Sequence, residues 1–398
     1  MKLSPQQEKA AVAVSRWLRT RSQPYFQLAG YAGTGKTTIA KLLAGDADGP
    51  VYYAAYTGKA AHVLRRMGVD NASTIHRLIY TPRDKCDAHL RSLRDRRLQL
   101  TARDPPPSAD EVAKLDMEIA REISNLRRPY FNLNGESPLW SASLVVIDEY
   151  SMVDQQTGRD LLSFGVPILA LGDPGQLPPV QGHRFFTREP DVMLTEIHRQ
   201  ASENPIIRLS RDVREGRSLR PGLYGSSQIL RRSAMSNAHI GDVIQNTDQL
   251  LVGTNNTRHA FNEKIRQMYG RLDTYPVRGD KLVCLRNSHQ EGLLNGQTFT
   301  VKRVTKKHYL ELHLEGEDGE RVACVAHRYH FDGDQNNLMP EDNKLANEFD
   351  YGYALTVHKA QGSQWDKVAL VDEWHFKDRE KWLYTAVTRA AESIIIMM

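Results

Sequence analysis

Cysteine is scarce in this chain, with three residues among 398, Cys86, Cys284 and Cys324, and no C-x-x-C pair. This spacing predicts neither a zinc site nor a disulfide framework, and it is typical of a reducing cytosol. The N-terminal sequence MKLSPQQEKA lacks an apolar signal core, and no apolar run approaches the length of a membrane span. We therefore expect a cytoplasmic protein without a membrane partner.

A strong excess of one charge is also missing. Lysine and arginine number 53 against 48 aspartates and glutamates, which gives a net charge of +5. This mildly basic balance permits an anionic partner such as nucleic acid, but an ordinary enzyme would show it as well. The apolar content of 40% supports packed cores, and the length predicts roughly two to four domains.

What the chain does contain is a phosphate-binding motif. Residues 30–37 read GYAGTGKT and match G-x-x-x-x-G-K-[ST] at every fixed position. The flanking residues predict a strand before the motif and a helix after it, which is the context that the motif requires. Backbone N–H groups of such a loop surround phosphates, Lys36 would reach the β- and γ-phosphates, and Thr37 would ligate Mg²⁺. The predicted cofactors are ATP and Mg²⁺, and the predicted nucleotide-binding residues of this segment are Gly30, Gly33, Thr34, Gly35, Lys36, Thr37 and Thr38.

Short apolar strands alternate with helical patterns through the first half of the chain. The strands are expected at 25–29, 51–55, 143–147, 167–171 and 192–194. This alternation predicts an α/β fold in which helices cover a parallel sheet.

A charged segment at 83–128 interrupts this pattern and is interpreted as an insertion on the sheet domain. Within it, Ser108 and Glu111 form a capping box that opens an amphipathic helix. Residues 130–140, around Asn134-Gly135, predict a small hairpin.

The second half has a buried strand at 249–253 and then changes character. Short β-like runs separated by turns predict a small antiparallel barrel, at 281–285, 298–304, 309–314 and 321–325. From Tyr351 the α/β pattern resumes, with strands expected at 353–357, 367–371 and 393–397. We therefore expect the barrel to be inserted in a second α/β domain.

Two acidic residues follow a buried strand downstream of the phosphate-binding motif. The strand 145–147 leads to Asp148, which would hold Mg²⁺ through water, and to Glu149, which would deprotonate the attacking water. A solvated turn is the alternative interpretation. After the next strand, Gln176 could sense a γ-phosphate or its attacking water, or could be incidental in a proline-rich turn.

Three further residues are candidates for nucleotide contact. Arg199 and Arg389 would stabilise charge on the γ-phosphoryl group from across a cleft, although an arginine taken singly is more often a surface residue. Near the N-terminus, Ser4, Pro5 and Gln7 fit the capped start of a helix. The amide of Gln7 could in addition lie against adenine.

The order of motifs resembles that of superfamily-1 helicases of the RecD-like and Dda-like branch, over nearly the whole chain. The matching segments are LSPQQ at 3–7, GYAGTGKT at 30–37, YTGKAA at 56–61, STIHRL at 73–78, DEYSM at 148–152, GDPGQLPPV at 172–180, LTEIHR at 194–199, ALTVHKAQGS at 354–363 and YTAVTR at 384–389. In its compact form the chain is most similar to phage Dda-like helicases.

The resemblance implies a role for each matched residue. Gln7 would contact adenine, and Thr37 and Asp148 would hold the metal. The implied catalytic residues are Lys36, Glu149, Gln176, Arg199 and Arg389, and Gly362 and Gln364 join the nucleotide-binding residues. Single-stranded DNA would lie along Thr57, Lys59, Thr74, His76, Phe131, Thr356 and His358, with Phe131 on a strand-separating pin.

The implied fold is α/β, with two RecA-like motor domains, a small SH3-like β-barrel inserted in the second, and the charged insertion plus pin hairpin in the first. The expected domains are 1A at 1–200, with insertion and pin at about 81–141, 2A at 201–276 and 349–398, and 2B at 277–348. The charged insertion is longer than the resemblance leads us to expect.

The implied function is that of an ATP-dependent DNA helicase that moves 5′ to 3′ on single-stranded DNA and separates tailed duplexes. We expect a monomer in a bacterial cell or a phage-infected host, with single-strand-binding or replication proteins as candidate partners. Replication, repair and recombination are equally open as pathways. The alternatives are a viral-type superfamily-1 RNA helicase and a nucleic-acid-stimulated ATPase that remodels protein–DNA complexes without unwinding.

Overall fold

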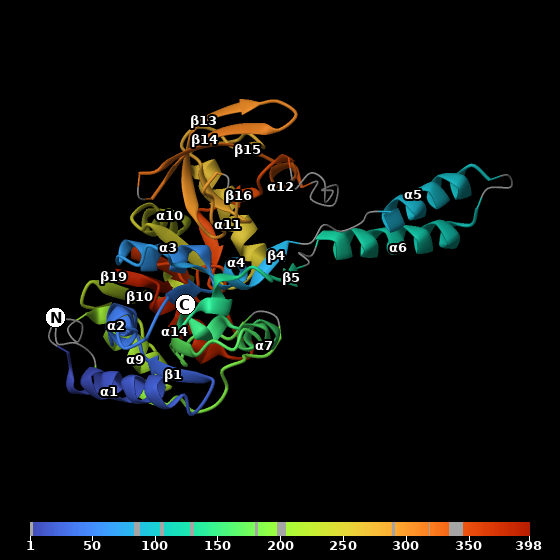
Figure 1. The fold of residues 1–398 in the computed structure, drawn as a ribbon. Helices are drawn as coiled ribbons and strands as arrows, with labels where there is room; N and C mark the ends of the chain where they lie inside the picture. The colour runs from blue at the N-terminus through green and yellow to red at the C-terminus, as the bar shows by residue number, and fades with distance from the viewer. Residues whose placement is uncertain are drawn as a thin grey trace.

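The computed structural model describes residues 3–82, 88–103, 107–127, 131–179, 182–196, 204–288, 291–317, 319–333 and 345–398. Figure 1 shows a body from which a helical arm projects. None of the helices in these ranges has the length and apolar character needed to cross a bilayer.

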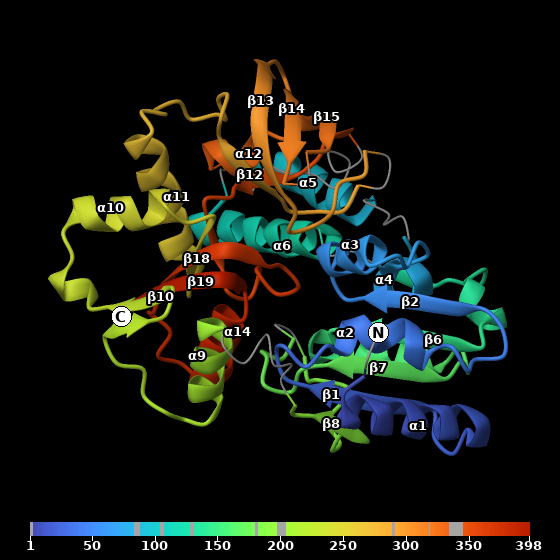
Figure 2. The same ribbon diagram turned by 90° about the vertical axis from the view of Figure 1, so that its left-hand side faces the viewer.

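The first part of the body is built on a parallel sheet with the strand order β3-β2-β6-β7-β1-β8 (Figure 2). Its strands are β1 (Tyr25–Gly30), β2 (Val51–Ala55), β3 (Ser73–Thr74), β6 (Leu144–Asp148), β7 (Ile168–Gly172) and β8 (Val192–Leu194). Every residue of β6 and β7 is buried, because elements packed on both faces exclude water from the sheet. The expected strands of the first half are therefore confirmed.

Helices cover both faces of this first sheet. One face carries α1 (Pro5–Thr20), α2 (Lys36–Leu43) and α3 (Gly58–Arg66), and the other carries α4 (Ile75–Ile79), α7 (Gln155–Leu162) and the 3-10 helices η1 (Pro138–Ser141) and η2 (Tyr150–Met152). Helix α1 begins where Ser4 caps it, and Ala10, Val14 and Trp17 recur at helical spacing on its buried face.

The second part repeats this architecture with the strand order β17-β11-β18-β19-β10-β9, parallel except between β9 and β10. Its strands are β9 (Gly222–Tyr224), β10 (Ser227–Leu230), β11 (Gln249–Val252), β17 (Ala354–Thr356), β18 (Trp365–Val371) and β19 (Ala390–Met397). Helices α9 (Pro205–Arg214) and α14 (Arg379–Val387) cover one face, while α10 (Asn237–Gln245) and α11 (Asn255–Met268) cover the other; η3 (Arg232–Ala234) follows β10. Two α/β domains are thus confirmed.

The third part is an antiparallel sheet with the order β15-β14-β13-β12-β16. Its elements are β12 (Lys281–Cys284), β13 (Thr298–Lys306), β14 (Leu310–Gly316), β15 (Arg321–Ala326), α12 (Tyr329–Asp332) and β16 (Phe349–Tyr351). A bridge between Ala326 and Asn347 connects the end of β15 with the segment before β16. We call this unit the barrel domain, although its SH3-like character stays a prediction.

The boundary of the barrel domain differs from the expected one. Strand β16 pairs with β12, so residues 349–351 belong to the third sheet rather than to the second motor domain, where they were expected. A run of three residues is too short for its alternation to show which sheet it joins.

The predicted hairpin within residues 130–140 is wrong. Strand β5 (Phe131–Leu133) pairs instead with β4 (Tyr80–Pro82), about fifty positions earlier in the chain. Asn134 starts a tight turn, in which its side chain accepts a hydrogen bond from the backbone N–H of Glu136, and the chain then enters η1. Phe131 therefore lies on a two-stranded ribbon with β4.

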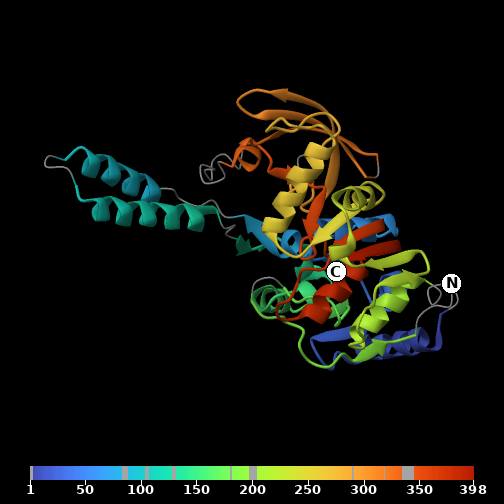
Figure 3. The same cartoon turned by 180° about the vertical axis from the view of Figure 1, so that it is seen from behind.

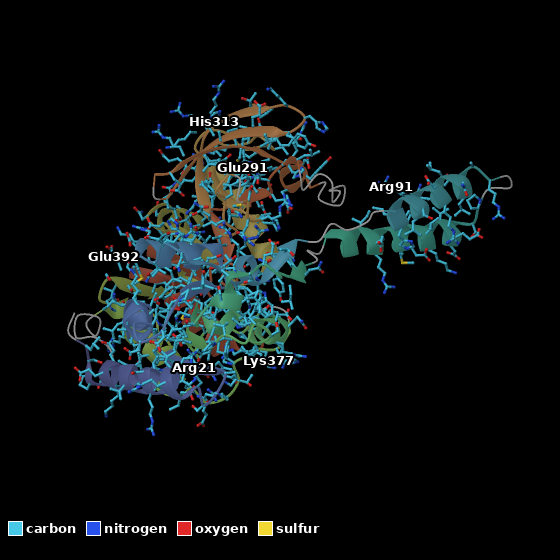
Figure 4. The ribbon with its side chains drawn as sticks, in the orientation of Figure 1. Arg21, Arg91, Glu291, His313, Lys377 and Glu392 are labelled. Carbon is cyan, nitrogen blue, oxygen red and sulfur yellow. The ribbon has the colours of Figure 1, made fainter. Side chains whose placement is uncertain are left out.

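The arm consists of α5 (Ala88–Thr101) and α6 (Ala109–Arg127), which pack through Leu90, Leu93 and Leu115. The predicted capping box of α6 is present, since Ser108 and Glu111 exchange side-chain to backbone hydrogen bonds. The sequence did not predict α5, whose arginines interrupt its apolar spacing. The arm stands clear of the body in Figures 1 and 3, and Figure 4 places Arg91 on it.

Candidate active site and nucleic-acid interface

The phosphate-binding loop joins β1 to α2 at the carboxyl end of the first sheet. Gly33 and Gly35 have φ angles of 79° and 75°, which side chains rarely tolerate. Lys36 donates hydrogen bonds from Nζ to the carbonyl oxygens of Gly30 at 2.5 Å and Tyr31 at 3.0 Å. The lysine ammonium is therefore held against the mouth of the loop, at the position where phosphate oxygens would replace the two carbonyls.

The acidic pair lies next to this loop, because β6 ends at the same edge of the sheet as β1. The hydroxyl of Thr37 donates to Oδ2 of Asp148 at 3.0 Å, and Asp148 is 8% exposed. Burial raises the pKa of Asp148, against the opposing effect of its hydrogen bonds. Among the described residues, no cluster of three or more His, Cys, Asp or Glu side chains could hold a metal ion. The hydroxyl of Thr37 and the carboxylate of Asp148 are hard oxygen ligands, and they fit a magnesium ion that is completed by the oxygens of a bound nucleotide.

Glu149 has two properties of a functional residue. Its φ of 57° places a non-glycine residue in the left-handed region, which costs free energy and is concentrated at functional sites. Burial and the neighbouring Asp148 raise the pKa of Glu149 to about 7, against the attraction of Arg389 and Lys36. A carboxylate with such a pKa is suited to accept a proton at neutral pH.

Gln176 follows β7 in the first domain, and Arg389 precedes β19 in the second. Oε1 of Gln176 is buried and has no hydrogen-bond partner among the described residues, so the site has an acceptor ready for a water or ligand. Arg389 is 5% exposed and donates to the Ser363 carbonyl at 3.1 Å. Its positive charge opposes the rise in the pKa of Glu149. These residues together fit Mg²⁺ and ATP.

The other residues that were predicted to bind the nucleotide make different contacts, are exposed, or lie outside the described residues. The side chain of Gln7 accepts from Ser4 N–H and donates to the Thr34 carbonyl at 3.1 Å, so it caps α1 and supports the phosphate-binding loop. Thr38 and Gln364 are exposed. Arg199 lies outside the described residues. The adenine contact of Gln7 stays a prediction.

Three of the predicted DNA-binding residues are threonines at the carboxyl ends of strands. Thr57 follows β2, Thr74 ends β3 and Thr356 ends β17, and each hydroxyl accepts a hydrogen bond from the backbone N–H three residues later. A hydroxyl that accepts in this way can still donate its own O–H to a phosphate oxygen. The carboxyl edges of parallel strands are also where ligands bind in α/β sheets.

Aromatic rings accompany these threonines in the first domain. Tyr56, His76, Tyr80 and Phe131 form a continuous set with ring centroids 5.4–5.9 Å apart, and the Tyr80 and Phe131 rings are stacked. Phe131 is 37% exposed. We call these four residues the first aromatic patch.

The second domain has a matching set, which we call the second aromatic patch. The ring centroids of His358 and Trp374 lie 5.3 Å apart, and those of Trp374 and Phe376 lie 5.0 Å apart. Phe376 is 64% exposed. Lys377, which follows Phe376, lies in the lower part of the body in Figure 4. Burial lowers the pKa of both His358 and His76, so both rings are held as neutral, stackable imidazoles.

Lys59 is placed differently from the other predicted DNA-binding residues. Its ammonium donates to Oε2 of Glu317 in the barrel domain at 2.9 Å and lies 4.6 Å from the ring centre of Trp365. Glu317 also accepts hydrogen bonds from Thr298 and Trp365. Lys59 thus connects all three parts of the body, and a phosphate would have to compete with Glu317 for it.

Sequence reasoning missed several residues of these sites. Tyr80, Trp374 and Phe376 belong to the aromatic patches, and Tyr384 contacts the phosphate-binding loop. An exposed aromatic residue just after a predicted strand could have indicated Trp374 and Phe376. Tyr384 begins the matched segment YTAVTR, but no local pattern indicates its contacts, because its partners are hundreds of positions away.

Comparison with known proteins agrees with this geometry. The model of the family described as "AAA domain" matches residues 2–232, more than half of the chain. The chain belongs to this family. Residues 351–397 match a second family, described as "UvrD-like helicase C-terminal domain". The two matches contain the phosphate-binding loop and Arg389, respectively.

Two curated relatives are much longer than this chain. The "ATP-dependent RecD2 DNA helicase" of Deinococcus radiodurans is 27% identical over 397 residues, covering 92% of this chain and 46% of that protein. The "Conjugal transfer protein TraA" of Rhizobium radiobacter is 26% identical over 293 residues, covering 65% of this chain and 25% of that protein. The chain thus spans less than half the length of these relatives. The resemblance to the RecD-like branch is confirmed, while a particular likeness to Dda-like helicases is compatible with it.

Solved structures share the fold. A Pif1 helicase structure described as concerning DNA unwinding at forked dsDNA matches with a TM-score of 0.56 and 17% identity, covering 100% of this chain and 92% of that one. Bacteroides Pif1 bound to ssDNA matches with a TM-score of 0.54 and 16% identity over the same shares. At this identity the likeness concerns the fold, and it confirms two RecA-like motor domains.

Proposed function

We propose that this chain is an ATP-dependent DNA helicase that translocates 5′ to 3′ on single-stranded DNA and separates duplexes. The observation that carries the proposal is the phosphate-binding loop, whose Thr37 donates a hydrogen bond to Asp148 at 3.0 Å and whose Ala32 contacts the second motor domain. Because Arg389 belongs to that second domain, the reaction at the site depends on domain closure.

In the proposed reaction, Lys36 neutralises phosphate charge while Thr37 and Asp148 hold Mg²⁺, which supplies Lewis-acid stabilisation when bound. Glu149 takes a proton from the attacking water, and Gln176 orients that water through its unpartnered amide oxygen. Arg389 stabilises the charge on the γ-phosphoryl group. Since Ser363 and Thr388 hold the arginine in its own domain, it leaves when the domains separate.

Nucleic acid is proposed to lie across the carboxyl edges of the two sheets. Threonine hydroxyls would bind phosphates, and the two aromatic patches would stack on bases, a combination that binds single strands with little sequence preference. Phe131, on the ribbon of β4 and β5, is proposed to act as the pin at the fork. The RecD2 and Pif1 relatives are described as DNA helicases or as bound to DNA, which favours DNA as the substrate.

Strand displacement tests the proposal directly. Matched duplexes carry a 5′ or a 3′ single-stranded tail, in DNA and in RNA, and Lys36→Ala serves as the control for contaminating activity. We expect displacement of 5′-tailed DNA only, in the presence of ATP and Mg²⁺. Displacement from 3′ tails would overturn the polarity, displacement of RNA alone would favour an RNA helicase, and stimulated ATP hydrolysis without displacement would favour a remodelling ATPase.

A further inference from the structure

A single tyrosine hydroxyl joins the two motor domains at the phosphate-binding loop. Tyr384, on α14 of the second domain, accepts a hydrogen bond from the backbone N–H of Ala32 at 3.1 Å and donates one to Oδ2 of Asp173 at 2.6 Å. Its side chain is 1% exposed. Burial and the adjacent Asp173 raise the pKa of Tyr384 far above its ordinary range, so the hydroxyl keeps its proton and its two roles are fixed.

The loop with Asp173 and Gly175 leaves the Tyr384 side chain little room to move. Oδ1 of Asp173 accepts the backbone N–H of Gly175 at 2.9 Å, which leaves Oδ2 for the tyrosine. A Cβ on Gly175 would lie 3.1 Å from a ring carbon of Tyr384. The same loop continues to Gln176, so the position of Tyr384 and that of the nucleotide-sensing amide depend on one short segment.

Helix α14 connects Tyr384 with Arg389. The hydroxyl of Thr385 accepts the backbone N–H of Leu177 at 3.0 Å, which adds a second link between the helix and the Asp173 loop. At the end of the helix, Nε of Arg389 donates to the carbonyl oxygen of Thr385 at 3.1 Å. The guanidinium of Arg389 is therefore connected to the Ala32 backbone through one helix of two and a half turns.

A further contact from the second domain reaches the neighbouring loop residue. The guanidinium of Arg214, on α9, lies 3.5 Å from the ring centre of Tyr31. Because α9 and α14 share one apolar core, the two contacts on the phosphate-binding loop move together. The second domain thus contacts consecutive residues of this loop, Tyr31 and Ala32.

We propose that Tyr384 is a positioning residue of the nucleotide site, which ties the phosphate-binding loop and Asp173 to the helix that places Arg389. The inference rests on the proposed ATP hydrolysis and names a residue that touches no reacting atom. Without the hydroxyl, α14 loses its two hydrogen bonds to the first domain at this point, and Arg389 meets the γ-phosphoryl group in the correct geometry less often. The loss therefore appears in turnover more than in nucleotide affinity.

The kcat values of single and double variants test whether Tyr384 acts through Arg389. We expect Tyr384→Phe to lower kcat of single-strand-stimulated ATP hydrolysis by roughly tenfold, since a hydrogen bond to a charged group is lost, with a change in KM below about twofold. In an Arg389→Ala background the same substitution should lower kcat by less than about twofold, because its effect passes through the arginine. Equal losses in both backgrounds would refute the positioning role.

The matched control is Tyr353→Phe. Tyr353 is also a tyrosine of the second domain, partly buried, that donates to a buried aspartate, Asp280, at 2.7 Å. Among the described residues, none of its hydrogen bonds or ring contacts involves the nucleotide site. Its substitution should leave kcat unchanged. A tenfold loss in this variant would show that the effect of Tyr384→Phe reflects general damage to the domain.

Hydrogen exchange provides a readout that does not depend on activity. In the nucleotide-free protein, the peptide that contains Ala32 should exchange faster in Tyr384→Phe than in the wild type, and at the wild-type rate in Tyr353→Phe. Unchanged exchange would refute the contact itself. If the wild type failed to hydrolyse ATP but the exchange difference were found, the proposed function would fail while the tyrosine contact stood.

Discussion

The pairing of Lys59 with Glu317 leads to a prediction about single-strand binding. The two side chains are 16% and 39% exposed, and they join the first motor domain to the barrel domain. Burial pushes the pKa of Glu317 upward, but the charge of Lys59 and the hydroxyl of Thr298 outweigh it and lower the pKa. A phosphate that binds Lys59 must first displace this carboxylate, so Glu317→Gln should tighten the binding of single-stranded DNA.

The size of the effect follows from the exposure of the pair. A partly exposed ion pair contributes about 1 kcal/mol at most after screening by solvent, which corresponds to a gain of about fivefold in affinity. The glutamine amide keeps an oxygen that can accept from Thr298 and Trp365, so the shape of the contact is retained. If Lys59 gains one phosphate, the slope of log affinity against log salt should steepen by about 0.7.

Fluorescence anisotropy with a labelled oligonucleotide, titrated at several salt concentrations, measures both quantities. The matched control is Glu311→Gln, which removes the same charge from an exposed pair with Lys307 on the same sheet. An equal gain in both variants would mean that net charge alone acts. A tighter affinity with an unchanged salt slope would refute the assignment of Lys59 as a phosphate ligand.

Four further substitutions test the two sites. Lys36→Ala should abolish ATP hydrolysis and leave single-strand binding largely intact, as measured by phosphate release and anisotropy; wild-type turnover would reject the phosphate-binding assignment. Glu149→Gln should lower kcat by about 10²- to 10⁴-fold and retain nucleotide affinity; a loss of magnesium affinity alone would assign the metal to Glu149. Phe131→Ala and Phe376→Ala should each weaken single-strand binding by about 1–3 kcal/mol, whereas Leu223→Ala, another exposed apolar residue, should not; equal losses in all three would contradict stacking.

Much of the motor could be predicted because its signals are local. The phosphate-binding loop is a contiguous motif, and each strand that was expected in the first half is a short apolar run whose observed ends lie within one residue of the expected ones. The acidic pair could be predicted for the same reason, because Asp148 and Glu149 lie at the carboxyl end of a buried strand of a parallel sheet. Parallel strands gather their carboxyl ends at one edge, so these local predictions converge in space.

The features that sequence reasoning missed depend on non-local pairing. The strand with Phe131 pairs with residues 80–82 across the entire arm, and no local pattern indicates such a partner. The turn signal at Asn134-Gly135 was read as a hairpin, but here the turn leads into a 3-10 helix. The contact of Tyr384 with Asp173 was missed for the same reason, because the two residues are 211 positions apart.

The proposed nucleic-acid residues and the proposed nucleotide residues are joined by one short segment between β17 and β18. Gly362, with a φ of 76°, lies so close to Thr57 of the first domain that a Cβ would be 2.6 Å from the threonine hydroxyl oxygen. The next residue, Ser363, holds Arg389 through its carbonyl oxygen at 3.1 Å. If a bound nucleic acid moves Thr57 relative to the second domain, we expect the backbone that supports Arg389 to shift as well. This direct contact gives a physical reason for ATP hydrolysis to respond to nucleic acid without a long chain of intermediates.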